Sequence, residues 1–89
     1  MIKTVSIHVS GRVQKVGFRY FVSKKANDCM VTGFIQNQND GSVYIEASGE
    51  ALNINAFIDF CRKGPSWAIV TRCQISELPI TCWKDFEIR

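Results

Sequence analysis

The residues best suited to chemistry lie in one basic segment near the N-terminus. This segment begins with a glycine. The segment reads Gly11-Arg12-Val13-Gln14-Lys15-Val16-Gly17-Phe18-Arg19. It connects a strand-like stretch to a helix-like one, and backbone N–H groups at such a turn can converge on an anion. The planar guanidinium of Arg19 can donate to two phosphate oxygens. The segment therefore predicts an anion-binding loop, with a plain basic connection as the alternative.

Several common catalytic arrangements find no support in the residue types present. The chain has one histidine, His8, and we identify no serine paired with it, so a Ser/His/Asp triad is not expected. No cysteine is followed by an arginine six positions later, as a cysteine phosphatase would require. A phosphate-binding Walker A loop counted from Gly11 would need its second glycine at Val16. The loop is thus expected to work without a covalent nucleophile or a bound metal.

The four cysteines predict neither a zinc site nor a reactive thiol. They are Cys29, Cys61, Cys73 and Cys82. No CxxC pair occurs, and the single histidine supplies no second imidazole. Because their neighbours are apolar, we expect reduced thiols in the core of a cytoplasmic protein. One disulfide remains an alternative.

Charge is distributed unevenly along the 89 residues. Residues 1–27 contain six basic side chains and no acidic one, although the net charge of the whole chain is only +3. A basic N-terminal third suggests an anionic partner. No apolar run approaches the ~18 residues of a membrane helix, and the alternating N-terminus does not resemble a signal peptide. We expect one domain over residues 1–89 with no membrane partner.

Hydrophobic periodicity predicts a two-layer α+β fold. Alternation predicts strands over Thr4–Ser10, Val31–Asn37, Ser42–Ser48 and Trp67–Ile75, with a short last strand at Phe86–Ile88. Helical spacing predicts one helix through Phe18, Phe21, Val22, Ala26 and Cys29, and another through Ile54, Phe57, Ile58 and Cys61. Asp40-Gly41 indicates a hairpin, and Gly64-Pro65 ends the second helix. The order βαββαβ plus a short strand predicts a ferredoxin-like split βαβ sandwich, with both helices on one face of a mostly antiparallel sheet.

Two segments together resemble the acylphosphatase family. Residues 11–19 resemble its signature G-x-V-Q-G-V-x-F-R. Residues Gly33-Phe34-Ile35-Gln36-Asn37, followed by Asp40-Gly41-Ser42-Val43, resemble its second signature G-[FYW]-[AVI]-x-N. The likeness covers nearly the whole chain in length, element order and motif separation. It implies a monomer that hydrolyses small-molecule acyl phosphates to carboxylate and inorganic phosphate, without metal, cofactor or nucleic acid.

The resemblance also implies roles for individual residues. Arg19 matches the arginine that binds the substrate phosphate, and Asn37 matches the asparagine that orients the attacking water. The backbone cradle around the phosphate would be formed by Arg12, Val13, Gln14, Lys15, Val16, Gly17 and Phe18. An in-line water needs positioning and charge stabilisation more than a strong base when the leaving group is a carboxylate.

One position departs from the family pattern, because Lys15 stands where the signature has glycine. A lysine at positive φ costs ~1–2 kcal/mol, and its Cβ could tilt an amide out of the cradle. Its charge could instead favour the anion. The alternative function is therefore a weakly active or non-catalytic module that binds phosphate or carbamoyl-phosphate-like anions.

RNA binding on the open face of the sheet is a further alternative. It requires outward aromatic side chains on the central strands. The outward positions that we identify on two of the strands are Ser6, His8, Tyr44 and Glu46. With one aromatic among them, the sequence disfavours this function.

Overall fold

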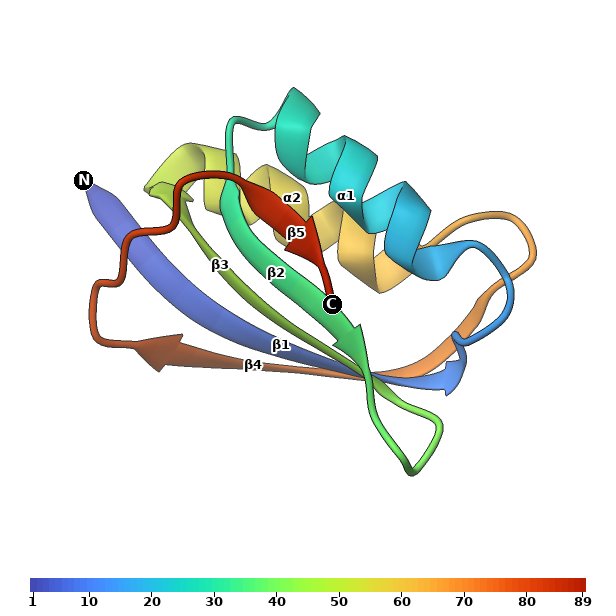
Figure 1. The fold of residues 1–89 in the computed structure, drawn as a ribbon. Coiled ribbons are helices and arrows are strands. Elements are labelled where there is room, and N and C mark those ends of the chain that lie inside the picture. The colour runs from blue at the N-terminus through green and yellow to red at the C-terminus, as the bar shows by residue number, and fades with distance from the viewer.

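A five-stranded sheet with two helices on one face forms the fold (Figure 1). The computed structural model describes residues 1–89. The elements are β1 (Ile2–Arg12), α1 (Phe18–Asp28), β2 (Thr32–Asn37), β3 (Val43–Glu50), α2 (Ala51–Lys63), β4 (Ile69–Leu78) and β5 (Phe86–Ile88). The strands lie in the order β4-β1-β3-β2-β5, and every pair is antiparallel except β2 with β5. The predicted ferredoxin-like α+β fold is confirmed.

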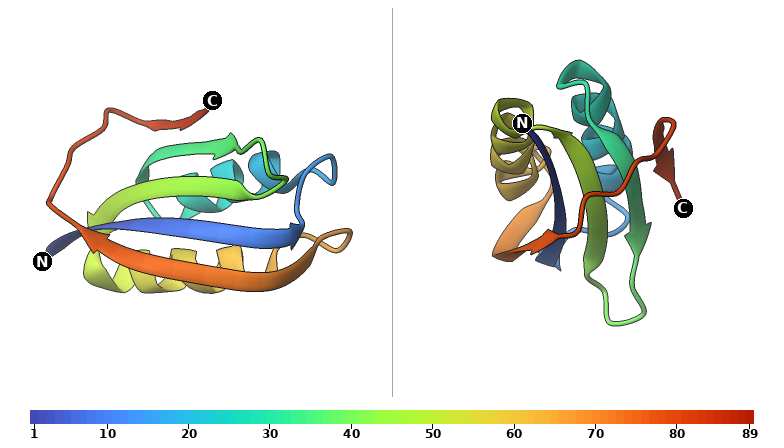
Figure 2. Two further views of the ribbon diagram at one scale, coloured as in Figure 1. Left: turned by 90° about the horizontal axis from the view of Figure 1, so that it is seen from below. Right: turned by 90° about the vertical axis from the view of Figure 1, so that its left-hand side faces the viewer.

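The core lies between the sheet and the two helices, which both lie behind the sheet in the left view of Figure 2. Alternate residues of the central strands face the helices, and the register aligns Ile75, Ile7, Ile45 and Ile35 in one row across four strands. The helices fill the other side of the core with Phe18, Val22, Ala26, Ile54, Phe57, Ile58 and Cys61. Burial of these apolar faces fixes where α1 begins, and hence where its first amides lie.

The predicted strand Trp67–Ile75 is wrong at both of its ends, because β4 spans Ile69–Leu78. β4 begins at Ile69, and Trp67 lies before it with 77% of its surface exposed. Ser10 pairs with Arg72 but Gly11 pairs with Val70, so Thr71 is an extra residue in the ladder. This bulge reverses the alternation. Ile69 is therefore exposed, whereas Val70 packs against the core in its place.

The prediction that all four cysteines are core thiols is wrong for Cys82. All four are free, and Cys61 is buried, Cys29 and Cys73 are half-buried, and Cys82 is exposed. Cys82 lies in the connection between β4 and β5, where no strand or helix periodicity directs an apolar side chain inward. No helix is long and apolar enough to cross a bilayer.

The open face of the sheet carries more aromatic residues than the sequence indicates. Phe34 and Trp83 lie there beside Tyr44. The centroid of the Phe34 ring is 6.0 Å from that of Trp83 and 6.1 Å from that of Tyr44. The Arg89 guanidinium lies 4.1 Å from the centre of the Phe34 ring. Phe34 is only 8% exposed, so these side chains pack on one another and leave it no free face on which a base could stack.

Gly33 is required where β2 and β3 approach closely. Its φ is +143°, and a Cβ there would lie 1.9 Å from the carbonyl oxygen of Glu46, a backbone atom that cannot move aside. We expect Gly33→Ala to lower the free energy of unfolding by about 3 kcal/mol or more, measured by urea denaturation. Gly41→Ala is the matched control, because Gly41 has φ +93° but no atom within 4 Å of the added Cβ, and about 1–2 kcal/mol is expected. Equal losses in the two variants would contradict the close approach.

Candidate active site

The loop between β1 and α1 is held at both ends by buried side chains. Val13 and Phe18 are each 1% exposed and belong to the core. Between them the chain turns through Gly17, which precedes α1 with φ 77°. No side chain caps this end of α1, and its first turn contains no acid. Because the first amides of a helix have no intrahelical acceptor, they are available to an anion.

The side chain of Gln14 ties this loop to the β2–β3 hairpin. Its Nε2 donates to the carbonyl oxygens of Gln38 and Ser42, each at 2.8 Å. Ser42 is fixed in turn, since its hydroxyl and its amide both donate to Oδ1 of Asp40, at 2.6 Å and 3.0 Å. These two bonds lower the pKa of the Asp40 carboxyl, which therefore stays ionised at neutral pH. The loop and the end of β2 are thus held in one arrangement.

His8 does pair with a serine, contrary to the sequence expectation. The Nε2 of His8 lies 2.8 Å from the Ser42 hydroxyl, across the pairing of β1 with β3. The arrangement is nevertheless not a catalytic triad. Ser42 lies between His8 and Asp40 and is 4% exposed, whereas a triad places histidine between the nucleophile and the acid.

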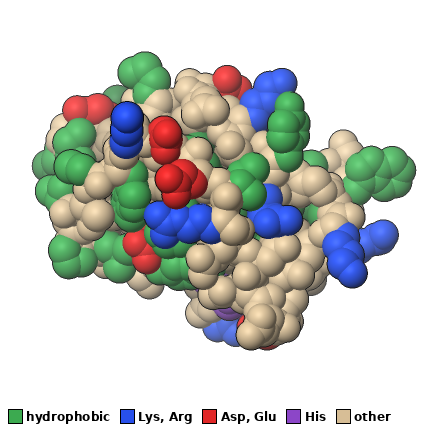
Figure 3. All heavy atoms as spheres, viewed as in Figure 1, with side chains coloured by type: hydrophobic (Ala, Val, Ile, Leu, Met, Phe, Trp, Pro, Cys, Tyr) green, Lys and Arg blue, Asp and Glu red, His purple; other side chains and the backbone are tan.

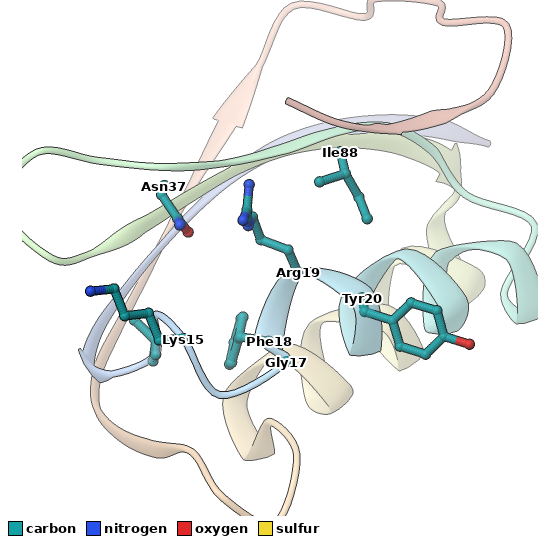
Figure 4. A pocket seen from close by; sticks show the side chains of 8 residues that line it. Lys15, Gly17, Phe18, Arg19, Tyr20, Asn37 and Ile88 are labelled. Carbon is teal, nitrogen blue, oxygen red and sulfur yellow. The ribbon is translucent and has the colours of Figure 1, made fainter.

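A pocket of about 220 Å³ opens at the N-terminal end of α1 (Figure 4). Its lining residues are Val13, Lys15, Gly17, Phe18, Arg19, Tyr20, Asn37 and Ile88. The Arg19 and Asn37 side chains reach into it from the start of α1 and the end of β2. Arg19 Nη1 donates to the main-chain oxygen of Arg89 at 3.3 Å. Since no acidic residue lines the pocket, its charged groups favour an anion.

Most of the predicted site residues line this pocket, but three do not. Arg12 is exposed at the end of β1, Val16 packs against the core, and the Gln14 side chain turns to the hairpin. Sequence reasoning missed Tyr20 and Ile88. Ile88 reaches the site only through the parallel pairing of β5 with β2, for which the local sequence carries no signal. Tyr20 directly follows Arg19, and that adjacency could have indicated it.

Lys15 has φ 61°, which is the left-handed conformation considered for it from the sequence. Its side chain is exposed at the pocket and takes part in no hydrogen bond or ion pair. Basic side chains are visible around this loop at the right of Figure 3, without acidic ones beside them. The strain therefore accompanies an unpartnered positive charge.

The cysteines supply no nucleophile to this site. Burial is the main cause that raises the pKa of the Cys61, Cys73 and Cys29 thiols, so these thiols are protonated at neutral pH. No cysteine lines the pocket. No group of three or more His, Cys, Asp or Glu side chains is gathered as a metal site would need.

Comparison with known proteins settles the family. The acylphosphatase family model matches residues 5–88. The chain belongs to the acylphosphatase family. It is 39% identical over 88 residues to an acylphosphatase of Thermotoga petrophila, covering 99% of this chain and 98% of the relative. Family membership supports the hydrolysis of acyl phosphates as its general activity.

Solved structures agree with this membership. An acylphosphatase from Coxiella burnetii superposes with a TM-score of 0.95 at 33% identity, over 99% of this chain and 93% of that one. Full-length HypF in its phosphate- and nucleotide-bound form also matches, with a TM-score of 0.89 and 33% identity. The match covers 100% of this chain and 12% of HypF, so the acylphosphatase fold here is similar to one part of a larger protein.

The Gln14 anchor leads to a prediction about the loop. Gln14→Ala removes both hydrogen bonds to the hairpin and should lower the free energy of unfolding by about 1–3 kcal/mol. It should also speed amide hydrogen exchange in residues 13–17 before the core opens, measured by NMR. Gln74→Ala, on the exposed open face, is the control and should change neither quantity. Exchange in the loop that matches the control would show that Gln14 does not hold it.

Proposed function

We propose that this chain hydrolyses acyl phosphates with Arg19 and the 12–18 loop binding the phosphate and Asn37 positioning the attacking water. One observation carries the proposal: Arg19 and Asn37 reach one acid-free pocket at the uncapped N-terminal end of α1. The guanidinium fork and the helix amides suit the same phosphoryl group, because both present N–H donors to oxygen acceptors. An uncharged amide on the opposite wall suits a water molecule instead.

In the proposed reaction, one water replaces the acyl oxygen at phosphorus. The side-chain oxygen of Asn37 accepts a hydrogen bond from the water. This bond orients the water so that a lone pair of the water oxygen points at phosphorus, in line with the bond to the acyl oxygen. That P–O bond breaks, and its electron pair leaves with the carboxylate. The protons of the water pass to phosphate oxygens, so the products are a carboxylate and dihydrogen phosphate. Arg19 and the loop amides stabilise the negative charge on the equatorial oxygens throughout.

The leaving group explains why so few side chains suffice. A carboxylate is a weakly basic leaving group that departs without protonation, so no general acid is needed. The substrate phosphate accepts the proton from water, so no histidine is needed either. We accordingly propose a metal-independent enzyme without a cofactor. We also propose that residues 1–89 form one acylphosphatase-like domain and that the protein is a cytoplasmic monomer.

Two observations favour the alternative, a module that binds phosphate- or carbamoyl-phosphate-like anions with little or no turnover. Lys15 is strained at φ 61° where the family signature has glycine. The chain also matches part of HypF, a much larger protein solved with phosphate and nucleotide. Both functions need the same anion pocket and differ in turnover, which is therefore the quantity to measure.

Turnover of benzoyl phosphate at neutral pH, with a chelator present, separates the two functions. We expect hydrolysis that EDTA does not reduce, and a fall in kcat/KM of about 10³-fold in Arg19→Ala. Inorganic phosphate should also inhibit that variant more weakly, because the guanidinium binds the anion. Lys24→Ala, on the exposed side of α1, is the matched control for loss of a cation and should retain full activity. Hydrolysis that survives Arg19→Ala, or that EDTA abolishes, would contradict the proposal.

Asn37→Ala should separate catalysis from binding. Because the amide positions water and does not hold the phosphate, we expect kcat to fall by about 10²–10³-fold. The inhibition constant of inorganic phosphate should change by less than about threefold. Asn39→Ala, in the exposed hairpin turn outside the pocket, is the control and should leave both values unchanged. Equal losses of rate and of phosphate affinity in Asn37→Ala would assign Asn37 to binding instead.

A further inference from the structure

His8 is the single histidine of the chain, and the proposed reaction does not use it. It lies half-buried in the central strand β1, and its Nε2 is 2.8 Å from the hydroxyl oxygen of Ser42. The ladder between β1 and β3 ends at the pair Val9–Val43, so Ser42 is the first hairpin residue beyond it. The His8 side chain therefore ties the hairpin to β1 at the point where main-chain pairing stops.

The direction of this hydrogen bond follows from the single proton of the Ser42 hydroxyl. The hydroxyl oxygen lies 2.6 Å from Oδ1 of Asp40, and the bonds from Ser42 lower the pKa of that carboxyl, so the proton lies between Ser42 and an ionised carboxylate. Only lone pairs of the hydroxyl oxygen remain for His8. Its Nε2 must therefore carry a proton and donate, in the neutral ring as well as in the imidazolium.

The other end of Ser42 holds the loop that leads into α1. The carbonyl oxygen of Ser42 accepts hydrogen bonds from the main-chain amide of Gln38 and from Nε2 of Gln14, both at 2.8 Å. Gln14 is thus separated from His8 by one residue and two hydrogen bonds. A displacement of Ser42 would move the acceptor on which the Gln14 side chain depends, and with it the loop.

We propose that His8 is a positioning residue of the active site, which donates from Nε2 to the Ser42 hydroxyl and thereby holds the carbonyl to which Gln14 anchors the phosphate loop. His8 does not line the pocket, so it acts only through Ser42 and Gln14. The inference rests on the proposed function, because it gives His8 a part in phosphate binding by that loop.

Two substitutions of His8 separate the hydrogen bond from the rest of the side chain. His8→Leu removes the donor, and we expect kcat/KM for benzoyl phosphate to fall about tenfold because the loop loses its fixed position. His8→Gln restores an N–H donor and should recover kcat/KM to within about threefold of the wild type. Gln74→Leu is the matched control, because Gln74 is exposed and pairs with His8 from β4, and it should leave kcat/KM unchanged.

A double-mutant cycle distinguishes positioning from a general structural effect. If His8 acts through Gln14, the variant with both His8→Leu and Gln14→Ala should lose no more kcat/KM than Gln14→Ala alone. Losses that multiply would overturn the inference, as would full activity in His8→Leu or equal activity in His8→Leu and His8→Gln.

Two NMR measurements need no hydrolysis and therefore separate this inference from the proposed function. At about pH 9, where an ordinary histidine is neutral, the His8 ring should carry its proton on Nε2. A proton on Nδ1 instead would overturn the assignment. Amide hydrogen exchange in residues 13–17 should be faster in His8→Leu than in Gln74→Leu, relative to the core amides. Equal exchange would show that His8 does not hold the loop, whereas an inactive wild type with these two signatures would contradict the proposed function alone.

Discussion

Two hydrogen bonds from the Gln14 side chain to the carbonyl oxygens of Gln38 and Ser42 join the two loops on which the site depends. One loop leads into α1, whose first turn carries the helix amides and Arg19. The other leads out of β2 and follows Asn37. Neither loop belongs to the sheet or to a helix, so core packing alone does not fix their separation. The Ser42 hydroxyl is itself hydrogen-bonded to Asp40 and His8, and His8 belongs to the central strand β1. The Gln14 contact therefore fixes the loop at the pocket to the central strands.

The core decides where these loops begin. Val13 and Phe18 are buried at either end of the first loop, so the five residues of chain from Val13 to Gly17 must turn within a fixed span. The turn uses left-handed conformations at Lys15 and Gly17. A glycine adopts this conformation without strain, whereas a lysine does not. The strain at Lys15 is thus a local cost that the packing of the rest of the fold offsets.

Periodicity predicted the elements of this fold because the sheet has one buried face and each helix has one apolar stripe. It could not predict the bulge at Thr71, since a bulge depends on which residues pair across two strands. The exposure of Ile69 and the late start of β4 follow from that pairing. Phe34 was placed in a strand correctly, but its contacts with Trp83 and Arg89 depend on where the last segment crosses the sheet.

The site was predictable to the extent that it lies in continuous sequence. Arg19 and most of the loop follow from residues 11–19, and the second motif indicated Asn37. The hydrogen bonds of Gln14 and the position of Ile88 beside the pocket depend on long-range contacts, which no local pattern encodes. The signature indicated that Lys15 stands where the family has glycine, but only the structure shows that its φ is positive.

The proposed function depends on binding of the phosphoryl group by the β1–α1 loop and Arg19. An NMR titration of the uniformly labelled chain with inorganic phosphate tests it most directly. We expect saturable shifts concentrated on the amides of residues 14–20 and on the Arg19 guanidinium, with little change on the open face of the sheet around Tyr44. Saturable shifts elsewhere, or none in this loop, would contradict it.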